Sequence, residues 1–286
     1  MNTNAAVSTV SRPWLSLPGA LCAALLALAL AGCAGAPGAA GSLPGLDSPA
    51  PARTDAADAD ETDLRRRARI RLELASNYFD QGQTQIALEE TRQAIVTDPT
   101  YSDAFNLRGL IYMRLNDPRL AEDNFRRAIG LNARDANALH NYGWLLCQQA
   151  RYPEAMQAFR QAMSNPIYPE RAKTLMTQGL CQARAGQRAE AESSLARSYE
   201  LDAGNPVTGY NLALLMYQRG EFPRAQFYIR RINNSEQANA ETLWLGVRVE
   251  RRMQDRVAMT QLADQLKKRF PQSREAAANE RGAFDE

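Results

Sequence analysis

The sequence predicts an all-α protein, a superhelical solenoid of six helix-turn-helix repeats. Three observations lead to this prediction. Small residues recur at two positions of a 34-residue frame, bulky apolar residues recur at a third position, and breaks that contain glycine or proline separate the implied helices. The chain has 286 residues, 45% of them hydrophobic, and is therefore long enough to bury a core.

The repeated units cover residues 68–101, 102–135, 136–171, 172–205, 206–238 and 239–272. The eighth position is always glycine or alanine and the twentieth is always alanine: Ala75, Gly109, Gly143, Gly179, Ala213 and Gly246, then Ala87, Ala121, Ala155, Ala191, Ala225 and Ala258. Antiparallel helices approach closely only where both carry small side chains, so we expect these residues to pack each pair together. The twenty-fourth position is bulky except at Thr91, and Gln182 interrupts an apolar eleventh position.

Breaks between paired helices are expected at residues 81–83, 116–118, 149–153, 185–187 and 219–223. Glycine ends a helix well, and proline suits the first turn of the next one. The two additional residues of the third unit lie in the two-proline connector 164–169. We expect the last helix over residues 256–269, where its basic end acts as a polar cap, and a C-terminal tail over residues 273–286.

This pattern resembles the tetratricopeptide repeat (TPR), which implies that positions 2, 5, 9 and 12 of each first helix face a concave groove. In the first three units these positions include Leu72, Phe79, Asn106, Leu110, Met113, His140 and Trp144, and in the next two Met176, Leu180, Tyr210, Leu214 and Tyr217. Exposed aromatic and methionine side chains indicate a groove that binds a peptide or helix. Alternatively, some of these side chains pack between repeats. Few charged residues lie on the stripe (Arg69, Asp103, Lys173, Glu250), so no basic clamp for a terminal carboxylate is expected.

The composition argues against several classes of function. A formal net charge of +2 provides no basic excess for nucleic-acid binding. His140 is the only histidine, which excludes a multi-histidine metal centre, and we interpret it as a polar groove residue. Acidic residues fall mainly on outward helix positions, and no paired carboxylates mark a cleft. The sequence therefore predicts no enzyme, cofactor, metal site or small-molecule substrate.

Residues 1–32 are expected to be a signal peptide, because the apolar run 15–30 is shorter than the roughly 20 residues that span a membrane. The segment Leu30-Ala31-Gly32-Cys33 resembles a bacterial lipobox, which implies that Cys33 carries a lipid anchor. The alternative is an ordinary signal peptide with a chance cysteine. Ala34 stands where an aspartate would favour inner-membrane retention, so the resemblance implies an outer-membrane anchor facing the periplasm. Residues 33–66, rich in Ala, Gly, Pro and Asp, are expected to form a disordered tether.

Two cysteines remain after Cys22 in the signal peptide and Cys33 at the lipobox. Cys147 and Cys181 lie in the first helices of adjacent units, which stack side by side. A shift of up to one helical turn in the alignment would bring their Cα atoms to the roughly 5.5–6 Å that a disulfide requires. An even number of cysteines in an oxidising compartment favours a disulfide, and two buried thiols are the alternative.

Some stretches of the repeats are more specific, namely residues 140–148, 165–169, 178–181, 220–225 and 227–231. Together they resemble the PilW/PilF family of type IV pilus biogenesis lipoproteins, over nearly all of residues 68–272. The resemblance implies a non-enzymatic pilotin and a Cys147–Cys181 disulfide. It also implies a pilus secretin subunit as the protein partner, and a pilotin helps the secretin to reach the outer membrane and to form its ring. The alternative is a TPR lipoprotein that serves another envelope machine, for β-barrel assembly or peptidoglycan synthesis. Thr91, Gln182 and the long tether depart from the family pattern.

Overall fold

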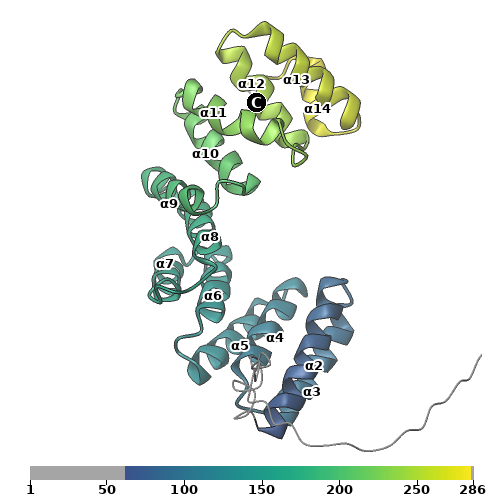
Figure 1. Ribbon diagram of the computed structural model, residues 1–286, viewed down its shortest axis with the longest axis vertical. Helices are drawn as coiled ribbons and strands as arrows, with labels where there is room; N and C mark the ends of the chain where they lie inside the picture. The colour runs from purple at the N-terminus through teal and green to yellow at the C-terminus, as the bar shows by residue number, and fades with distance from the viewer. Residues whose placement is uncertain (1–61, 285–286) are drawn as a thin grey trace, which may run out of the picture. The chain divides into compact units, whose positions relative to one another are not determined.

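The computed structural model describes residues 62–284, and every regular element in this part of the chain is an α-helix (Figure 1). Twelve helices form six consecutive antiparallel pairs, which confirms the predicted all-α solenoid of six repeats. The pairs are α2 (Asp63–Asp80) with α3 (Thr84–Thr97), α4 (Ser102–Arg114) with α5 (Pro118–Leu131), α6 (Ala136–Gln148) with α7 (Tyr152–Ala162), α8 (Arg171–Arg184) with α9 (Arg188–Leu201), α10 (Pro206–Gln218) with α11 (Phe222–Asn233), and α12 (Ala240–Arg252) with α13 (Arg256–Arg269). A further helix, α14 (Arg274–Arg281), follows the last pair.

The turn inside each pair follows one backbone pattern. One residue per turn has a positive φ, at equivalent places in all six units: Gly82, Asn116, Ala150, Gly186, Gly220 and Gln254. Glycine adopts this conformation freely, whereas Ala150 and Gln254 do so at a cost of about 1–2 kcal/mol each. The turn geometry is therefore imposed by helix packing even where the residue does not favour it.

Short polar side chains set the start of several helices. Asp117, Asp135, Asn205, Asp255 and Ser273 each accept a hydrogen bond from a backbone N–H of the helix that follows. Asn239 and Thr242 form a reciprocal capping box at α12. These bonds satisfy donors that the first helical turn leaves unpaired.

The two helices of a pair meet where glycine lies against a bulky side chain. A Cβ built on Gly109 would lie 2.5 Å from Cε1 of Phe125, and one on Gly143 would lie 2.7 Å from Cε1 of Phe159. At Gly179 it would meet Leu195 at 2.7 Å and the carbonyl oxygen of the small residue Ala191 at 3.2 Å. Each glycine therefore creates the space that a buried side chain fills.

The departure at Thr91 follows from the same contact. Its unit has Ala75 where four others have glycine opposite Phe or Leu, so the space for the opposing side chain is smaller. Thr91 is fully buried, and its hydroxyl donates to the carbonyl oxygen of Ala87 at 2.6 Å. The fifth unit also combines alanine (Ala213) with a β-branched residue, Ile229. The eighth and twenty-fourth positions are thus matched in size.

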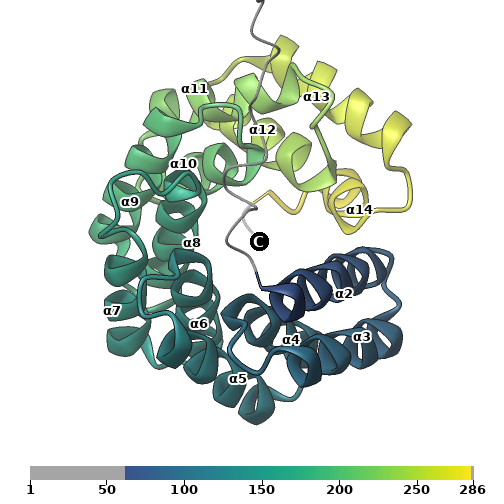
Figure 2. The same cartoon turned by 60° about the horizontal axis from the view of Figure 1, so that its bottom comes forward.

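Consecutive pairs contact each other mainly where the second helix of one pair packs on the first helix of the next. Each first helix touches the next first helix, and each second helix touches the first helix of the next pair. Within residues 62–284, no second helix touches the next second helix. The first helices are therefore closer together and line the inner side of this curved helical unit (Figure 2). We call the exposed surface of α2, α4, α6, α8, α10 and α12 the inner face.

The structure corrects the prediction at both ends of the repeats. Residues 63–66, expected in the tether, belong to α2, because Arg65 bonds Asp98 at 2.5 Å and lies 4.6 Å from the ring centre of Tyr101. Residues 274–281 form α14 instead of a tail. Residues 1–61, with the expected signal peptide and Cys33, lie outside the described residues.

Helix α14, and not α13 as expected, covers the end of the last pair. Ala276 of α14 is buried with Trp244 and Leu266, and Phe284 stacks on Trp244 with 5.4 Å between ring centres. The apolar side chains of α12 and α13 would otherwise lack the next repeat to pack against. No helix among residues 62–284 combines the length and the apolar character needed to cross a membrane.

A disulfide joins the third and fourth pairs. Cys147 of α6 and Cys181 of α8 are bonded, with 5.8 Å between their Cα atoms. Both are buried, in a cluster with Leu146 and Phe159. The bond therefore links two neighbouring first helices directly beneath the inner face.

We predict that Gly109→Ala lowers the free energy of unfolding by about 1–3 kcal/mol, because the new methyl group overlaps Phe125. The matched control is Gly130→Ala in α5, where a Cβ meets nothing within 4 Å. That change should instead stabilise the protein by about 0.5–1 kcal/mol through helix propensity. Urea unfolding of both variants measures the difference. Equal effects of the two substitutions would contradict the packing described here.

We predict that Cys147→Ala with Cys181→Ala lowers stability by about 3–4 kcal/mol, the amount expected for closing a loop with a sequence separation of 34 residues. Thermal unfolding with and without a reductant measures this effect. The wild type should lose stability in the reductant, whereas the double variant should not respond. A wild type that is indifferent to reduction would show that the disulfide does not contribute.

Candidate partner-binding face

Most of the side chains expected to face the groove are partly exposed on the first helices of the first three pairs. They are Leu72 and Phe79 of α2, Asn106, Leu110 and Met113 of α4, and Trp144 of α6. Asn141 of α6 donates to Asn106 of α4 at 2.9 Å, so polar contacts also cross between first helices. Leu72 packs against buried residues of the first two pairs, and Leu110 and Met113 pack against Phe125 and Leu145. These side chains thus contribute to packing and to the surface.

Arginines from the next first helix cover three of the inner-face aromatic rings. The guanidinium carbon of Arg114 lies 3.5 Å from the ring centre of Phe79, and Arg114 also donates to the Phe79 carbonyl oxygen. Arg184 lies 4.6 Å from the ring centre of Trp144. Arg248 lies 4.8 Å from that of Tyr217. The inner face is therefore more basic than the stripe of positions 2, 5, 9 and 12 indicated.

His140 lies below this face instead of on it. It is 6% exposed, and its Nδ1 lies 2.9 Å from the hydroxyl of Thr174 on α8. That hydroxyl donates to the Tyr168 hydroxyl at 3.3 Å. Burial, assisted by the charge of Lys173, lowers the pKa of His140 to about 4. The expectation of a polar groove residue is therefore corrected: His140 is a neutral polar link between α6 and α8.

Glu250, expected on the stripe, also lies elsewhere. Its side chain is fully buried and accepts hydrogen bonds from Arg230 at 2.6 and 2.9 Å and from Gln226 at 2.7 Å. Both partners belong to α11, because Glu250 faces the preceding second helix. It therefore holds the last two pairs together and presents no charge to a partner.

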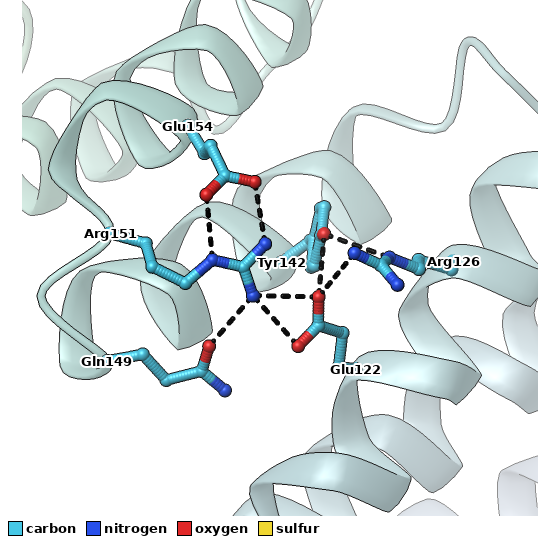
Figure 3. A network of polar contacts seen from close by, with 6 residues as sticks. All are labelled: Glu122, Arg126, Tyr142, Gln149, Arg151 and Glu154. Carbon is cyan, nitrogen blue, oxygen red and sulfur yellow. Dashed lines mark hydrogen bonds and ion pairs between the residues drawn. The ribbon is translucent and has the colours of Figure 1, made fainter.

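A polar network joins the second and third pairs (Figure 3). Arg151 donates to both carboxylate oxygens of Glu122 on α5, at 2.8 and 2.9 Å, and to Glu154 on α7 at 2.6 and 2.8 Å. Tyr142 of α6 donates to Glu122 and accepts from Arg126, each at 3.2 Å. Burial acts to raise the pKa of Glu122, but the hydrogen bond from Arg151 and the charges of Arg126 and Arg151 hold that pKa below its usual value. The network thus keeps α6 fixed against α5.

The same kind of link recurs two repeats later. Arg219 and Arg224 both contact Glu192 of α9, and both contact Glu221 in the turn that precedes α11. Within residues 62–284, no three His, Cys, Asp or Glu side chains are arranged to hold a metal ion. In the described part of the chain, ion pairs of Glu122, Glu192 and Glu250 link neighbouring repeats.

Comparison with known proteins identifies the family. Residues 106–172 match a tetratricopeptide-repeat family model. The type IV pilus assembly protein PilF of Pseudomonas aeruginosa is 30% identical over 204 residues, which cover 71% of this chain and 81% of PilF. The chain belongs to the PilF/PilW family of type IV pilus biogenesis proteins. No enzyme family is indicated by these matches.

Solved structures of PilF/PilW family members share the fold. One of Pseudomonas aeruginosa PilF has a TM-score of 0.71 at 28% identity and covers 77% of this chain and 100% of its own. The crystal structure of PilW, a widely conserved type IV pilus biogenesis factor, has a TM-score of 0.68 at 27% identity. It covers 76% of this chain and 99% of PilW.

Sequence reasoning missed the inner arginines of this PilF/PilW family member. Arg114 and Arg184 are each one residue beyond the twelfth position, and Arg248 is one beyond the ninth. A long side chain reaches across neighbouring positions, so a prediction limited to positions 2, 5, 9 and 12 leaves it out. A signal for two of these contacts was present in the sequence. Arg114 and Arg184 occupy the thirteenth position of the second and fourth units, and the unit before each has an aromatic residue at the ninth or twelfth position.

We predict that acid destabilises the protein through His140. The folded pKa of about 4 is below the unfolded value of 6.5, so the unfolded chain binds more protons between these values, and stability falls as pH falls. From pH 7 to pH 5 the loss is about 2 kcal/mol. His140→Gln retains a polar group and removes this titration. Urea unfolding of tag-free protein should show a smaller change with pH for the variant, and parallel profiles would refute the assignment.

Proposed function

We propose that this protein is a non-enzymatic pilotin: an outer-membrane lipoprotein that faces the periplasm, binds the pilus secretin subunit, and promotes the localisation and multimerisation of the secretin. Membership of the PilF/PilW family carries the proposal, because it connects the chain to type IV pilus biogenesis. The lipobox-like residues that end in Cys33 support the anchor, although they lie outside the described residues.

The inner face supports the choice of a protein partner. Trp144, Phe79 and Tyr217 are only partly buried between neighbouring first helices. Partly exposed aromatic rings on a rigid concave surface are typical anchors for a protein partner. A lipid anchor at Cys33 would confine the protein and the secretin to one membrane surface, which raises their effective concentration.

We predict that Trp144→Ala reduces secretin multimers several-fold in the outer-membrane fraction, because a central aromatic contact is lost. The matched control is Phe227→Ala, since Phe227 is 62% exposed on the second helix α11. That variant should retain wild-type multimers. Electrophoresis without heating, followed by detection of the secretin, measures the multimer.

Two further strains test the anchor and the partner. Cys33→Ser should leave the protein soluble in the periplasm and reduce secretin multimers in the outer membrane, while total secretin remains present. A deletion strain with intact secretin rings and normal piliation would contradict the proposed function. Such a strain with defects in β-barrel assembly or peptidoglycan synthesis would instead point to another envelope machine.

A further inference from the structure

The arginines of the inner face differ from those in the inter-repeat networks. Arg151, Arg219 and Arg224 each contact two carboxylates. In the described part of the chain, no carboxylate pairs with Arg114 or Arg184. The inner arginines therefore keep positive charge that the fold does not neutralise.

Arg248 is the third member of this set. It too has no carboxylate partner among residues 62–284, and its Nε is buried without a hydrogen-bond partner. A buried guanidinium N–H that lacks an acceptor is costly. We call Arg114, Arg184 and Arg248, together with the rings of Phe79, Trp144 and Tyr217, the arginine strip.

Ring contact leaves the hydrogen-bonding edge of a guanidinium available, although one N–H of Arg114 already donates to the Phe79 carbonyl oxygen. A guanidinium that stacks on a ring uses its flat face, while its N–H groups point outward in the plane. Those groups fit the two oxygens of a carboxylate, and the ring already restricts the side chain. The strip therefore has the chemistry of a row of carboxylate sites.

We propose that the arginine strip binds an internal acidic segment of the partner protein, in which Asp or Glu residues alternate with apolar residues. This inference rests on the proposed function, since the secretin subunit is the partner it describes. Partly exposed apolar side chains lie on the same first helices, including Leu110, Met113, Met176, Leu180 and Leu214. They provide contacts for the apolar residues of the segment.

The charges on the inner helices also give the segment a preferred position. Arg114 and Arg184 are the last residues of α4 and α8, whereas Asp103 and Glu241 lie in the first turns of α4 and α12. Burial raises the pKa of Tyr210; the carboxylates of Glu241 and Glu275 act in the same direction, and the charge of Arg248 acts against them. An acidic segment is therefore drawn toward the ends of α4 and α8 and away from the beginnings of α4 and α12.

The spacing of the strip sets the spacing of the acidic residues. Arg114 and Arg184 lie on first helices that are two repeats apart. Packed helices are roughly 8–10 Å apart, so the two arginines are separated by roughly 16–20 Å. An extended chain rises about 3.3 Å per residue. Two carboxylates about five or six residues apart in an extended segment would meet both arginines.

The experiment measures peptide binding to the mature full chain in detergent by fluorescence anisotropy. One set of overlapping peptides tiles the secretin, and a second set has every Asp and Glu replaced by Asn and Gln. A third set tiles an outer-membrane β-barrel assembly protein. We expect acidic secretin peptides to bind and their amide counterparts to bind about tenfold more weakly or worse, since one charged hydrogen bond contributes about that factor.

Variants of the protein connect this binding to the strip. Arg184→Gln should weaken binding about tenfold, and Arg184→Lys should weaken it too, because lysine keeps the charge without the planar fork. Arg197→Gln is the matched control: Arg197 is exposed on the second helix α9 and has neither an ion pair nor a ring contact. It removes the same charge and should leave binding unchanged.

The outcomes separate this inference from the proposed function. Equal binding of the acidic and amide secretin peptides, or equal effects of Arg184→Gln and Arg197→Gln, would overturn the inference and leave the secretin as the partner. Acidic peptides of the third set that bind through Arg184, while secretin peptides do not, would support the strip and count against the secretin. Binding by none of the three peptide sets would overturn the inference. The proposed pilotin function would then be tested by the secretin multimer assay alone.

Discussion

The contact between a glycine and an aromatic or leucine side chain is the constraint on which the helix pairs depend. Gly109 and Gly143 accept the rings of Phe125 and Phe159 at distances that no Cβ would allow. The two helices of a pair are consequently close, and the ring that fills the contact is fully buried. Where alanine replaces glycine, as at Ala75, the opposing residue is the smaller Thr91. Size matching at this one contact is repeated along the chain, which makes each unit equivalent enough to stack.

Close packing inside pairs determines the surface available to a partner. First helices contact one another in series, whereas second helices do not, so the inner face is continuous across repeats. Side chains on neighbouring first helices can therefore interact over that face, as Arg184 does with Trp144. The polar network around Arg151 reinforces the same arrangement, because it ties α5 to α6 and to the start of α7. The fold and the candidate site therefore both follow from the way in which successive first helices pack together.

The repeat pattern predicted the fold because its contacts are local and recur at a fixed separation. Small residues at the eighth and twentieth positions indicate the helix pairs directly, and the disulfide partners Cys147 and Cys181 lie one repeat apart. The pattern does not predict the position of a side chain that is determined by contacts with neighbouring helices instead of by its place in the repeat. His140 has a groove position in the frame, but Thr174 and the surrounding helices bury it. Likewise, α14 lies beyond the last repeat, so no periodicity could indicate that Ala276 and Phe284 cover α12.

The junction between the third and fourth pairs shows how an insertion is accommodated. The connector 164–169 lengthens the chain there, which by itself would loosen the stacking of α8 on α6. Instead this junction has the disulfide, the bond from His140 to Thr174, and a hydrogen bond from Arg171 to the Met163 carbonyl oxygen at 2.8 Å. Trp144 and Arg184 lie on the two helices that are joined in this way. A pair held by covalent and buried polar links loses little freedom when a partner binds, so the centre of the inner face is the part best organised in advance for recognition.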